Sequence, residues 1–452
     1  MKRKTIRFGH NDQKKSALPT EPVSLTIDSM NHEGKGVARC DGKAVFVEDA
    51  LVGETVLAKV TVQHKRYDEA QLTEVISASP DRIAPLCKHY NECGGCQLQH
   101  MAPEAQLLAK QENVSNQLLR LGGITQPELE AALQPPITSP HWKYRRAARI
   151  GLNVLQRNDE AIVGFRRKKS NKLLQISECP VLDPKFDGIF LQLKELLDQQ
   201  DNKKAYTHAE LLAGDTAKLL LIRCKQYPSV ADQERFKAFA TEHGYNLHLK
   251  TDEVTLCLNA QEQDCYTLAK HDIQLHYHPG DFLQVNAVVN EAMIQQAIDW
   301  LDLSDNDVVL DLFSGLGNFT LPIARHVKHV IGIEGVDTMV ERASKNAALN
   351  NIENASFFRA DLSDNNQKQK WFKESYTKII LDPPRTGAYE LINQLPARAK
   401  SILYVSCEPS ALARDSKLLQ EKGYRLTRYN VMDMFPHTSH IESMALFTKM
   451  KK

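Results

Sequence analysis

Cys407 is the residue of this chain best placed to act as a nucleophile. It follows the apolar, strand-like run 402–405 and comes just before Pro409 and the helical pattern 410–419. In an open α/β sheet, ligands bind at the carboxyl ends of the strands, and a helix N-terminus favours a thiolate over a thiol. The alternative is a buried core cysteine, because free cysteine is among the most buried residue types.

Three further cysteines, Cys87, Cys93 and Cys96, have a spacing typical of a metal site. The Gly94–Gly95 pair allows the tight turn that lets two of them face one centre. A set of four thiolates needs one more ligand, and Cys179 is the best candidate because the proline after it restrains the backbone. Thiols clustered this densely would oxidise if they had no ligand. Zinc and an iron–sulfur cluster both accept four thiolates, so the spacing alone leaves the choice open.

A glycine-rich turn between a strand and a helix predicts a site for S-adenosylmethionine (SAM). The strand-like run 308–313 is followed by Gly315 and Gly317, and Thr320 stands where a dinucleotide fingerprint has its third glycine. Glu334 ends the next strand-like run, where a carboxylate is well placed to accept two ribose hydroxyls. The pattern therefore favours SAM over NAD as the cofactor.

Asp382 begins an Asp-Pro-Pro-Arg motif at the end of a further strand, beside the expected methyl donor. In amino-methyltransferases a comparable motif ends in an aromatic residue and grips an NH2 group. Arg385 holds that position here, and Cys407 belongs to the following strand. We therefore expect the methyl acceptor to be a carbon atom that must first be activated.

The elements that must position these residues fall into two groups of different pattern. From residue 280 onward, strands alternate with helices, which predicts a doubly wound α/β sheet. Between residues 21 and 79, five short alternating runs separated by turns predict a small barrel. This barrel resembles the TRAM domain, an oligonucleotide-binding-like barrel appended to RNA-modifying enzymes. A barrel with a purely structural role is the alternative.

The segment between these groups predicts a helix over 103–121, ended by Gly122, and mixed α/β structure over 181–278. It also contains a basic stretch with interleaved aromatic residues. We interpret this stretch as an RNA contact because the barrel precedes it, although a solvated, charged strand face also fits. Its members are Trp142, Lys143, Tyr144, Arg145, Arg146, Arg149, Arg166, Arg167, Lys168, Lys169 and Lys172.

Composition bounds these interpretations. A chain of 452 residues is long enough for about three domains, and its net charge of +1 means that affinity for nucleic acid must come from local basic patches. The basic N-terminal tail has no apolar stretch suited to export; a disordered end and a nucleic-acid-binding arm both fit it. No apolar run is long enough for a membrane span. We therefore expect a cytoplasmic protein whose nine cysteines serve metal binding or catalysis rather than disulfides.

Several motifs together resemble the bacterial 5-methyluridine RNA methyltransferases, the class I RNA m5U methyltransferase family. The motifs are FLQVN, DLFSGLGNF, LDPPR, YVSCEPSAL and HIESMALF. With the barrel and the four cysteines, nearly the whole chain past the tail resembles the type that modifies 23S ribosomal RNA. This resemblance implies a [4Fe–4S] cluster held by Cys87, Cys93, Cys96 and Cys179. It also implies contacts to SAM from Gln284, Phe313, Asn318, Glu334, Asp361 and Asp382.

The resemblance further implies methyl transfer to C5 of uracil 1939 in 23S ribosomal RNA. Uracil C5 is a poor nucleophile, so the Cys407 thiolate adds at C6 and makes an enolate whose C5 attacks the methyl group of SAM. A base must then remove the C5 proton. Glu442, in the polar segment 437–443 before the last strand, resembles the family's base; a helix-capping or surface carboxylate is the alternative. The uridine must also leave its stack, which costs a few kcal/mol.

These observations predict four parts of the chain: a basic flexible tail at 1–18, a TRAM barrel at 19–80, a central domain with the cluster at 81–279, and a SAM-dependent methyltransferase domain at 280–452. No obligate protein partner is evident. Other functions stay open: methylation of another 23S uridine or of transfer RNA, electron transfer through the cluster, and a non-catalytic RNA-binding role in ribosome assembly. No flavin or nicotinamide signature supports electron transfer, and Cys407 with Glu442 argues against the non-catalytic role.

Overall fold

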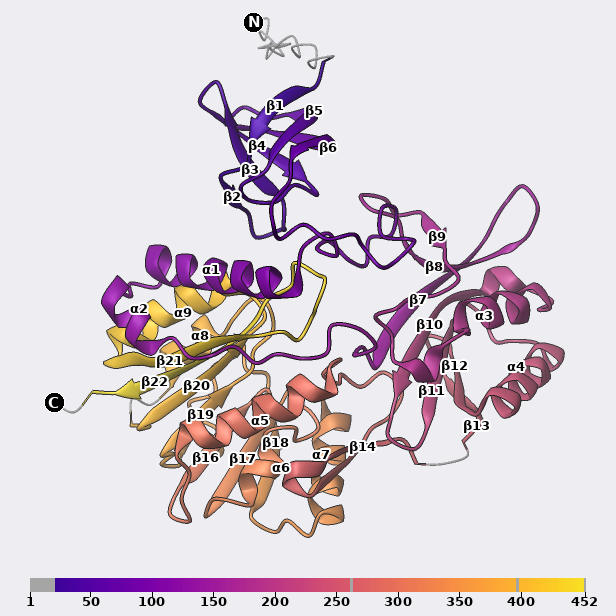
Figure 1. Ribbon diagram of the computed structural model, residues 1–452. Coiled ribbons are helices and arrows are strands. Elements are labelled where there is room, and N and C mark those ends of the chain that lie inside the picture. Colours follow the sequence, from indigo (N-terminus) through magenta and orange to yellow (C-terminus); the bar gives the residue numbers. More distant parts are fainter. Residues whose placement is uncertain (1–20, 261–262, 396–397, 451–452) are drawn as a thin grey trace, which may run out of the picture. The chain divides into compact units, whose positions relative to one another are not determined.

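The computed structural model describes residues 21–260, 263–395 and 398–450. Its contacts divide the chain into two compact units, Met1–Arg82 and Ile83–Lys452 (Figure 1). The predicted basic tail, 1–18, lies outside the described residues. Among the helices that are described, none is long and apolar enough to cross a membrane.

The first unit is a six-stranded sheet in the order β1-β5-β6-β4-β3-β2, antiparallel except where β4 pairs with β6. Five strands coincide with the predicted runs, and the two-residue strand β2 is an addition. Gly36 sits where β2 pairs with β3, and a Cβ there would lie 2.8 Å from Ile27 Cγ2, so a larger residue would displace the chain. The strands are β1 (Val23–Thr26), β2 (Ser29–Met30), β3 (Gly36–Cys40), β4 (Lys43–Glu48), β5 (Thr55–Gln63) and β6 (Tyr67–Ser77).

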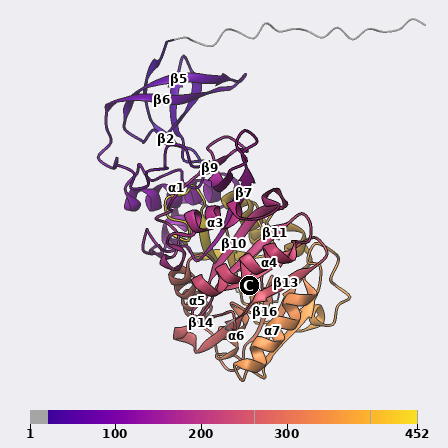
Figure 2. The same cartoon turned by 90° about the vertical axis from the view of Figure 1, so that its right-hand side faces the viewer.

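The middle of the chain forms a second sheet, in the order β13-β12-β11-β10-β7-β8-β9, with a separate hairpin of β14 and β15. Helices α3 and α4 pack on this sheet through a shared apolar core (Figures 1 and 2). The strands are β7 (Ala147–Val154), β8 (Ala161–Arg166), β9 (Leu173–Gln175), β10 (Tyr206–Ala213), β11 (Lys218–Cys224), β12 (Tyr245–Lys250), β13 (Thr255–Asn259), β14 (Cys265–Leu268) and β15 (Ile273–His276). The helices are α3 (Ile189–Asp198) and α4 (Val230–His243).

The C-terminal part contains the predicted doubly wound sheet. Its order is β18-β17-β16-β19-β20-β22-β21, and the first five of these strands run parallel. Strand β22 is antiparallel to both of its neighbours. The strands are β16 (Val308–Leu312), β17 (His329–Glu334), β18 (Ala355–Arg359), β19 (Lys378–Leu381), β20 (Ser401–Ser406), β21 (Tyr424–Met432) and β22 (Glu442–Lys449).

Helices cover both faces of this sheet because alternate strand residues point to opposite sides. Ile402 and Tyr404 of β20 belong to one apolar core with α1, α2, α8 and α9, and Leu403 and Val405 belong to a second core with α5, α6 and α7. The predicted helix after the glycine-rich turn is α6, which has only five residues. The helices are α1 (Pro103–Leu121), α2 (Gln126–Ala132), α5 (Ala287–Leu301), α6 (Thr320–Ala324), α7 (Asp337–Leu349), α8 (Tyr389–Gln394) and α9 (Pro409–Glu421).

Helix α1 has the predicted bounds and packs against α9 of the C-terminal sheet. Two buried contacts fix the chain just before β22 on this helix. Lys110 donates to Asp433 Oδ1 at 3.1 Å, and the backbone N–H of His437 donates to Gln106 Oε1 at 2.8 Å. A buried charge is stable only when it is paired, so the Lys110–Asp433 pair holds the loop that leads to Glu442 in one position. The predicted division at residue 280 stays a prediction.

Candidate active site

Cys407 lies at the carboxyl end of β20, two residues before α9 begins, as the sequence predicts. It lines a cavity of about 910 Å³, which we call the Cys407 cavity. Four predicted SAM contacts, the four predicted cluster cysteines and Glu442 line the same cavity. Residues from distant parts of the sequence are therefore brought to one place at the edge of the sheet where α/β proteins bind ligands.

Glu442 is the first residue of β22, and the antiparallel register places it beside Cys407. Ser406 pairs with Ser443, so the residues just beyond them, Cys407 and Glu442, lie at the same end of the two strands. Glu442 is only 6% exposed. Burial, together with the carboxyl group of Asp382, raises its pKa well above the ordinary value. A surface or capping carboxylate does not fit this position, so the alternative for Glu442 is wrong.

The thiol of Cys407 is not activated by the protein alone. Burial, followed by the nearby carboxyl groups of Glu442 and Asp382, raises its pKa to about 11 despite the opposing charge of Arg385. We expected the N-terminus of α9 to favour the thiolate. That expectation stays a prediction, and the net pKa is nevertheless raised, because burial and the two carboxyl groups favour the thiol.

Asp382 follows β19 and lines the Cys407 cavity, where it is half-buried and loss of solvation raises its pKa to about 7. Arg385, three residues on, is exposed, and its positive charge acts on Cys407 and His440. The Asp-Pro-Pro-Arg motif therefore acts on the Cys407 thiol in two opposed ways: the carboxyl group of Asp382 raises its pKa and the Arg385 cation lowers it.

Phe313, Glu334 and Gln284 line the Cys407 cavity, as predicted for SAM contacts. Phe313 has a φ of 69°, which is unusual for a bulky residue and marks a constrained turn after β16. The backbone N–H of Gly315 donates to Glu334 Oε2 at 3.1 Å, so the glycine-rich turn holds this carboxylate. The backbone of Gln284 is fixed by a hydrogen bond, because Arg146 Nε donates to its carbonyl oxygen at 2.8 Å.

Two predicted SAM residues do not line the cavity. The Asn318 amide exchanges hydrogen bonds with Asn290 at 2.8 and 3.0 Å, and its oxygen also accepts from the Tyr266 hydroxyl. Asp361 is exposed just after β18 and accepts from Ser363. Asn318 is placed to brace the turn, and Asp361 lies at the same edge of the sheet as Glu334.

Part of the predicted RNA-contact stretch is buried rather than available to RNA. Arg146 is 6% exposed and lies over the Tyr266 ring at 4.4 Å, and Tyr144 donates to the Pro436 carbonyl. The prediction of an RNA contact is therefore wrong for these two residues. The alternation of basic and aromatic residues in the sequence does not show which side chains pack inside the protein. Arg145 and Arg149 do line the Cys407 cavity.

Sequence reasoning did not assign a role to Phe282 and His440, which also line this cavity. Phe282 is 70% exposed, although a phenylalanine normally packs inside. Burial lowers the pKa of His440, so its imidazole is neutral at pH 7. Their positions in the sequence could have indicated this role, because Phe282 stands two residues before Gln284 and His440 stands two residues before Glu442.

The four predicted cluster cysteines come together on one wall of the Cys407 cavity. Burial raises the pKa of all four thiols, to about 12 for Cys96 and about 11 for Cys179. The backbone N–H of Gly95 points at Cys93 Sγ at 3.4 Å. In the part of the chain that is described, no three His, Cys, Asp or Glu side chains gather tightly enough to hold a single metal ion.

Comparison with known proteins identifies related families for both units. A family model described as tRNA (uracil-5-)-methyltransferase matches residues 105–450, and a TRAM domain model matches residues 20–73. The chain is 41% identical over 446 residues to the 23S rRNA (uracil(1939)-C(5))-methyltransferase RlmD of Alcanivorax borkumensis, covering 97% of this chain and 99% of the relative. It is 42% identical over 437 residues to RlmD of Aeromonas salmonicida, covering 96% and 98%.

A solved structure has the same fold over nearly the whole length. The Pyrococcus abyssi tRNA (uracil-54, C5)-methyltransferase, in complex with S-adenosyl-L-homocysteine, superposes with a TM-score of 0.73 at 22% identity, covering 94% of this chain and 99% of the other. At this identity the likeness concerns the fold. It agrees with the TRAM barrel and the α/β methyltransferase sheet described above.

Proposed function

This chain belongs to the tRNA (uracil-5-)-methyltransferase family of SAM-dependent RNA uracil-C5 methyltransferases, and from that premise we propose that it methylates C5 of uracil 1939 in 23S ribosomal RNA. The observation that carries the proposal is the pairing of Cys407 with Glu442 in one cavity of a chain 41% identical to the Alcanivorax RlmD. In this proposal, the TRAM barrel binds RNA, residues 81–279 hold the cluster and residues 280–452 bind SAM.

The first proposed step is addition of Cys407 Sγ to C6 of the flipped uracil. A thiol with a pKa of about 11 is ionised in roughly one molecule in 10⁴ at pH 7. Arg385 favours the thiolate and is placed to offset part of that cost. Addition forms the S–C6 bond and moves an electron pair into the ring, which makes C5 nucleophilic.

The second step forms the bond between C5 and the methyl group of the donor. SAM supplies an electrophilic methyl group on a positively charged sulfur, and S-adenosylhomocysteine leaves. Gln284, Phe313, Glu334 and Asp382 are the residues that we propose hold SAM. Asn318 and Asp361 belong to the same proposal, although neither lines the Cys407 cavity.

The last step removes the C5 proton and expels Cys407. Glu442 accepts that proton, the C5–C6 double bond forms again and the S–C6 bond breaks. A carboxylate whose pKa is raised by burial is a stronger base near neutral pH than an exposed one. The buried position of Glu442 therefore suits this role.

We expect the rate of single-turnover methyl transfer to rise with pH over about pH 6 to 9 without reaching a plateau. The pKa of Cys407 lies above this window, so the thiolate fraction grows about tenfold per pH unit. Glu442 acts only after methyl transfer, so its own ionisation does not limit this rate. Rapid-quench assays with labelled SAM at constant ionic strength measure this profile; a rate independent of pH above about pH 7 would contradict it.

We also propose that Cys87, Cys93, Cys96 and Cys179 hold a [4Fe–4S] cluster. The donor set of four partly buried cysteines that line one cavity supports it. Zinc and a [4Fe–4S] cluster both accept four thiolates, so the metal content of the purified protein decides between them.

Substituting Cys179→Ser should lower the iron and sulfide content and the melting temperature. The remaining folded protein should keep its turnover within about threefold, because no step of methyl transfer uses an electron. Iron and acid-labile sulfide are measured on protein purified without oxygen, with Cys257→Ser as the control for an exposed cysteine outside this wall. Colourless wild-type protein that contains one zinc ion would overturn the cluster assignment.

The substrate is tested with 23S ribosomal RNA that lacks the modification. Labelled SAM and the full-length protein should place one methyl group per RNA at uracil 1939, as mapped by mass spectrometry of nuclease fragments. Label at another uridine or in transfer RNA only would replace the proposed substrate. RNA binding without transfer would favour the assembly role.

A further inference from the structure

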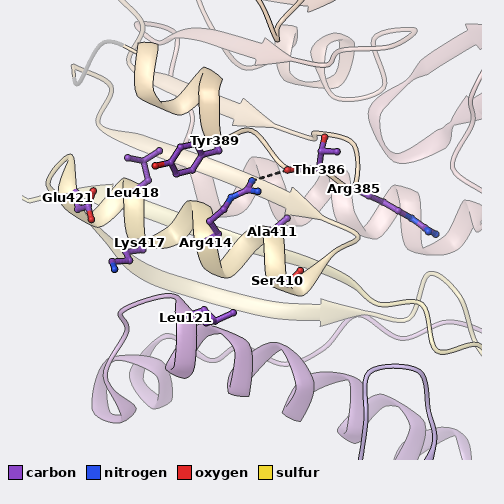
Figure 3. Close-up of a pocket in the computed structure, with 10 residues that line it drawn as sticks. All are labelled: Leu121, Arg385, Thr386, Tyr389, Ser410, Ala411, Arg414, Lys417, Leu418 and Glu421. Atoms are coloured by element: carbon purple, nitrogen blue, oxygen red, sulfur yellow. Dashed lines mark hydrogen bonds between the residues drawn. The ribbon is translucent and has the colours of Figure 1, made fainter. Parts of the chain in front are cut away.

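A second cavity, of about 610 Å³, shares Arg385 with the Cys407 cavity, and Figure 3 shows the residues that line it. We call it the α9 groove. It lies among α9, the end of α1 and the start of α8, and its size is within the range of about 300 to 1,000 Å³ usual for ligand sites. It is lined by Leu121, Arg385, Thr386, Tyr389, Ser410, Ala411, Arg414, Lys417, Leu418 and Glu421.

One face of α9 gives this groove its charge. Ser410, Arg414, Lys417 and Glu421 follow one another at intervals of three or four residues, which places them on one side of the helix. The first three offer a hydroxyl group and two cations over about 10 Å. Among the described residues, no carboxylate pairs with Lys417, so this ammonium group is available to a ligand.

Arg414 is fixed in place by a buried carboxylate. Asp415 is fully buried and accepts from Arg414 Nε at 2.8 Å, from the Tyr404 hydroxyl at 2.7 Å and from the Ala388 N–H at 2.7 Å. Arg414 Nη2 also donates to the Thr386 carbonyl at 2.8 Å (Figure 3). These bonds leave one end of the guanidinium facing the groove, so it needs little reordering to bind an anion.

Gly387 makes this arrangement possible. A Cβ at this position would lie 2.6 Å from Arg414 Nη2 and 2.6 Å from Asp415 Oδ2, and its φ is 75°. A side chain would therefore displace the guanidinium. The guanidinium also lies over the ring of Tyr389, with its carbon 5.3 Å from the ring centroid. Tyr389 itself is 40% exposed, which leaves ring surface for a ligand.

Arg385 connects the α9 groove with the Cys407 cavity, since it lines both. Its side chain extends away from Arg414 in Figure 3, and its charge acts on Cys407 and His440. A polymer whose reacting base sits at Cys407 would therefore pass Arg385 and continue into the groove. The groove offers what a nucleotide needs: cations for its phosphate and an aromatic ring for its base.

We propose that the α9 groove binds a nucleotide of the RNA strand that flanks the target uridine. Arg414 and Lys417 contact its phosphate, and Tyr389 stacks on its base. This inference rests on the proposed function, because it needs an RNA substrate. A hold on the flanking backbone would also help to keep the target base out of its stack, which costs a few kcal/mol.

The test measures binding of the full-length protein to a 23S rRNA fragment that contains uracil 1939. We expect Lys417→Ala to bind it about tenfold more weakly and to reduce the slope of log affinity against log salt by about 0.7, the value for one lost phosphate contact on a single strand. SAM affinity should stay within about twofold, since Lys417 does not line the Cys407 cavity. Lys237→Ala, an exposed lysine on α4, is the matched control.

A second pair of variants tests the ring. Tyr389→Ala should weaken binding about tenfold and Tyr389→Phe should restore it, because stacking needs the ring and not the hydroxyl. The inference is overturned if Lys417→Ala keeps wild-type affinity and salt slope, or if Lys237→Ala loses as much as Lys417→Ala does. Failure of the proposed function has a different signature: wild-type protein then binds the fragment but does not methylate it.

Discussion

Replacing Cys407 by alanine is expected to abolish methyl transfer, with a loss of at least roughly 10⁴-fold, the range found when a covalent nucleophile is removed. Without addition at C6, C5 of uracil stays too weakly nucleophilic to take the methyl group. Affinity for SAM should change less than about threefold, because the thiol serves addition rather than binding. Tritium release from RNA labelled at C5 measures turnover, and calorimetry measures SAM affinity.

The control for Cys407→Ala is Cys257→Ala, since Cys257 is an exposed free cysteine away from the Cys407 cavity. It should keep wild-type turnover. Circular dichroism and SAM affinity establish that the Cys407 variant is folded. If this folded variant still releases tritium at a rate near that of the wild type, a covalent mechanism through Cys407 is wrong.

Replacing Glu442 by glutamine should trap the reaction after methyl transfer. The amide keeps the shape and some hydrogen bonding of the carboxylate but cannot accept a proton as a base. Turnover should fall about 10²- to 10⁴-fold, which is the usual contribution of a general base. A covalent complex of protein and methylated RNA should accumulate, visible as a band that survives a denaturing gel.

That band should disappear in the double variant Cys407→Ala with Glu442→Gln, because the adduct needs the thiol. Substitution of a buried carboxyl group can also disturb folding, so SAM and RNA affinity are measured on the same preparation. Normal turnover in Glu442→Gln would assign proton removal to another residue or to water. RNA binding without an adduct would place Glu442 earlier in the reaction.

The sequence predicted this site well where local pattern and topology agree. An apolar run followed by Cys407, Glu408 and Pro409 identifies a strand end and a helix start, and β20 and α9 begin and end within two residues of that prediction. Carboxyl ends of parallel strands meet at one edge of a sheet. For this reason the sequence alone predicts that Phe313, Glu334 and Asp382 lie close together.

What could not be predicted depends on packing between distant segments. The raised pKa of Cys407 results from burial and from Glu442 and Asp382, which are far from it in sequence. The burial of Arg146 depends on its contact with Tyr266, which is 120 positions away in the separate hairpin of β14 and β15. A local sequence pattern shows charge and periodicity, but it does not show how far a side chain is buried in the folded protein.

The α9 groove is a further case. Arg414, Lys417 and Tyr389 look like ordinary surface residues in the sequence, and a charged helix face is usually solvated. Only the structure shows that Asp415 and Gly387 fix the guanidinium and that Arg385 lines both cavities. Preorganisation of this kind has no signature in spacing alone.

The central claim is that Cys407 bonds to C6 of a uracil whose C5 then receives the methyl group. Its most direct test uses wild-type protein, SAM and the 23S rRNA fragment with 5-fluorouridine at position 1939. Fluorine replaces the proton that Glu442 would remove, so elimination stops and the adduct persists. Tandem mass spectrometry should find one peptide, containing Cys407, that carries a pyrimidine with both fluorine and a methyl group. A pyrimidine attached to any other residue, or methylated RNA with no adduct, would contradict the claim.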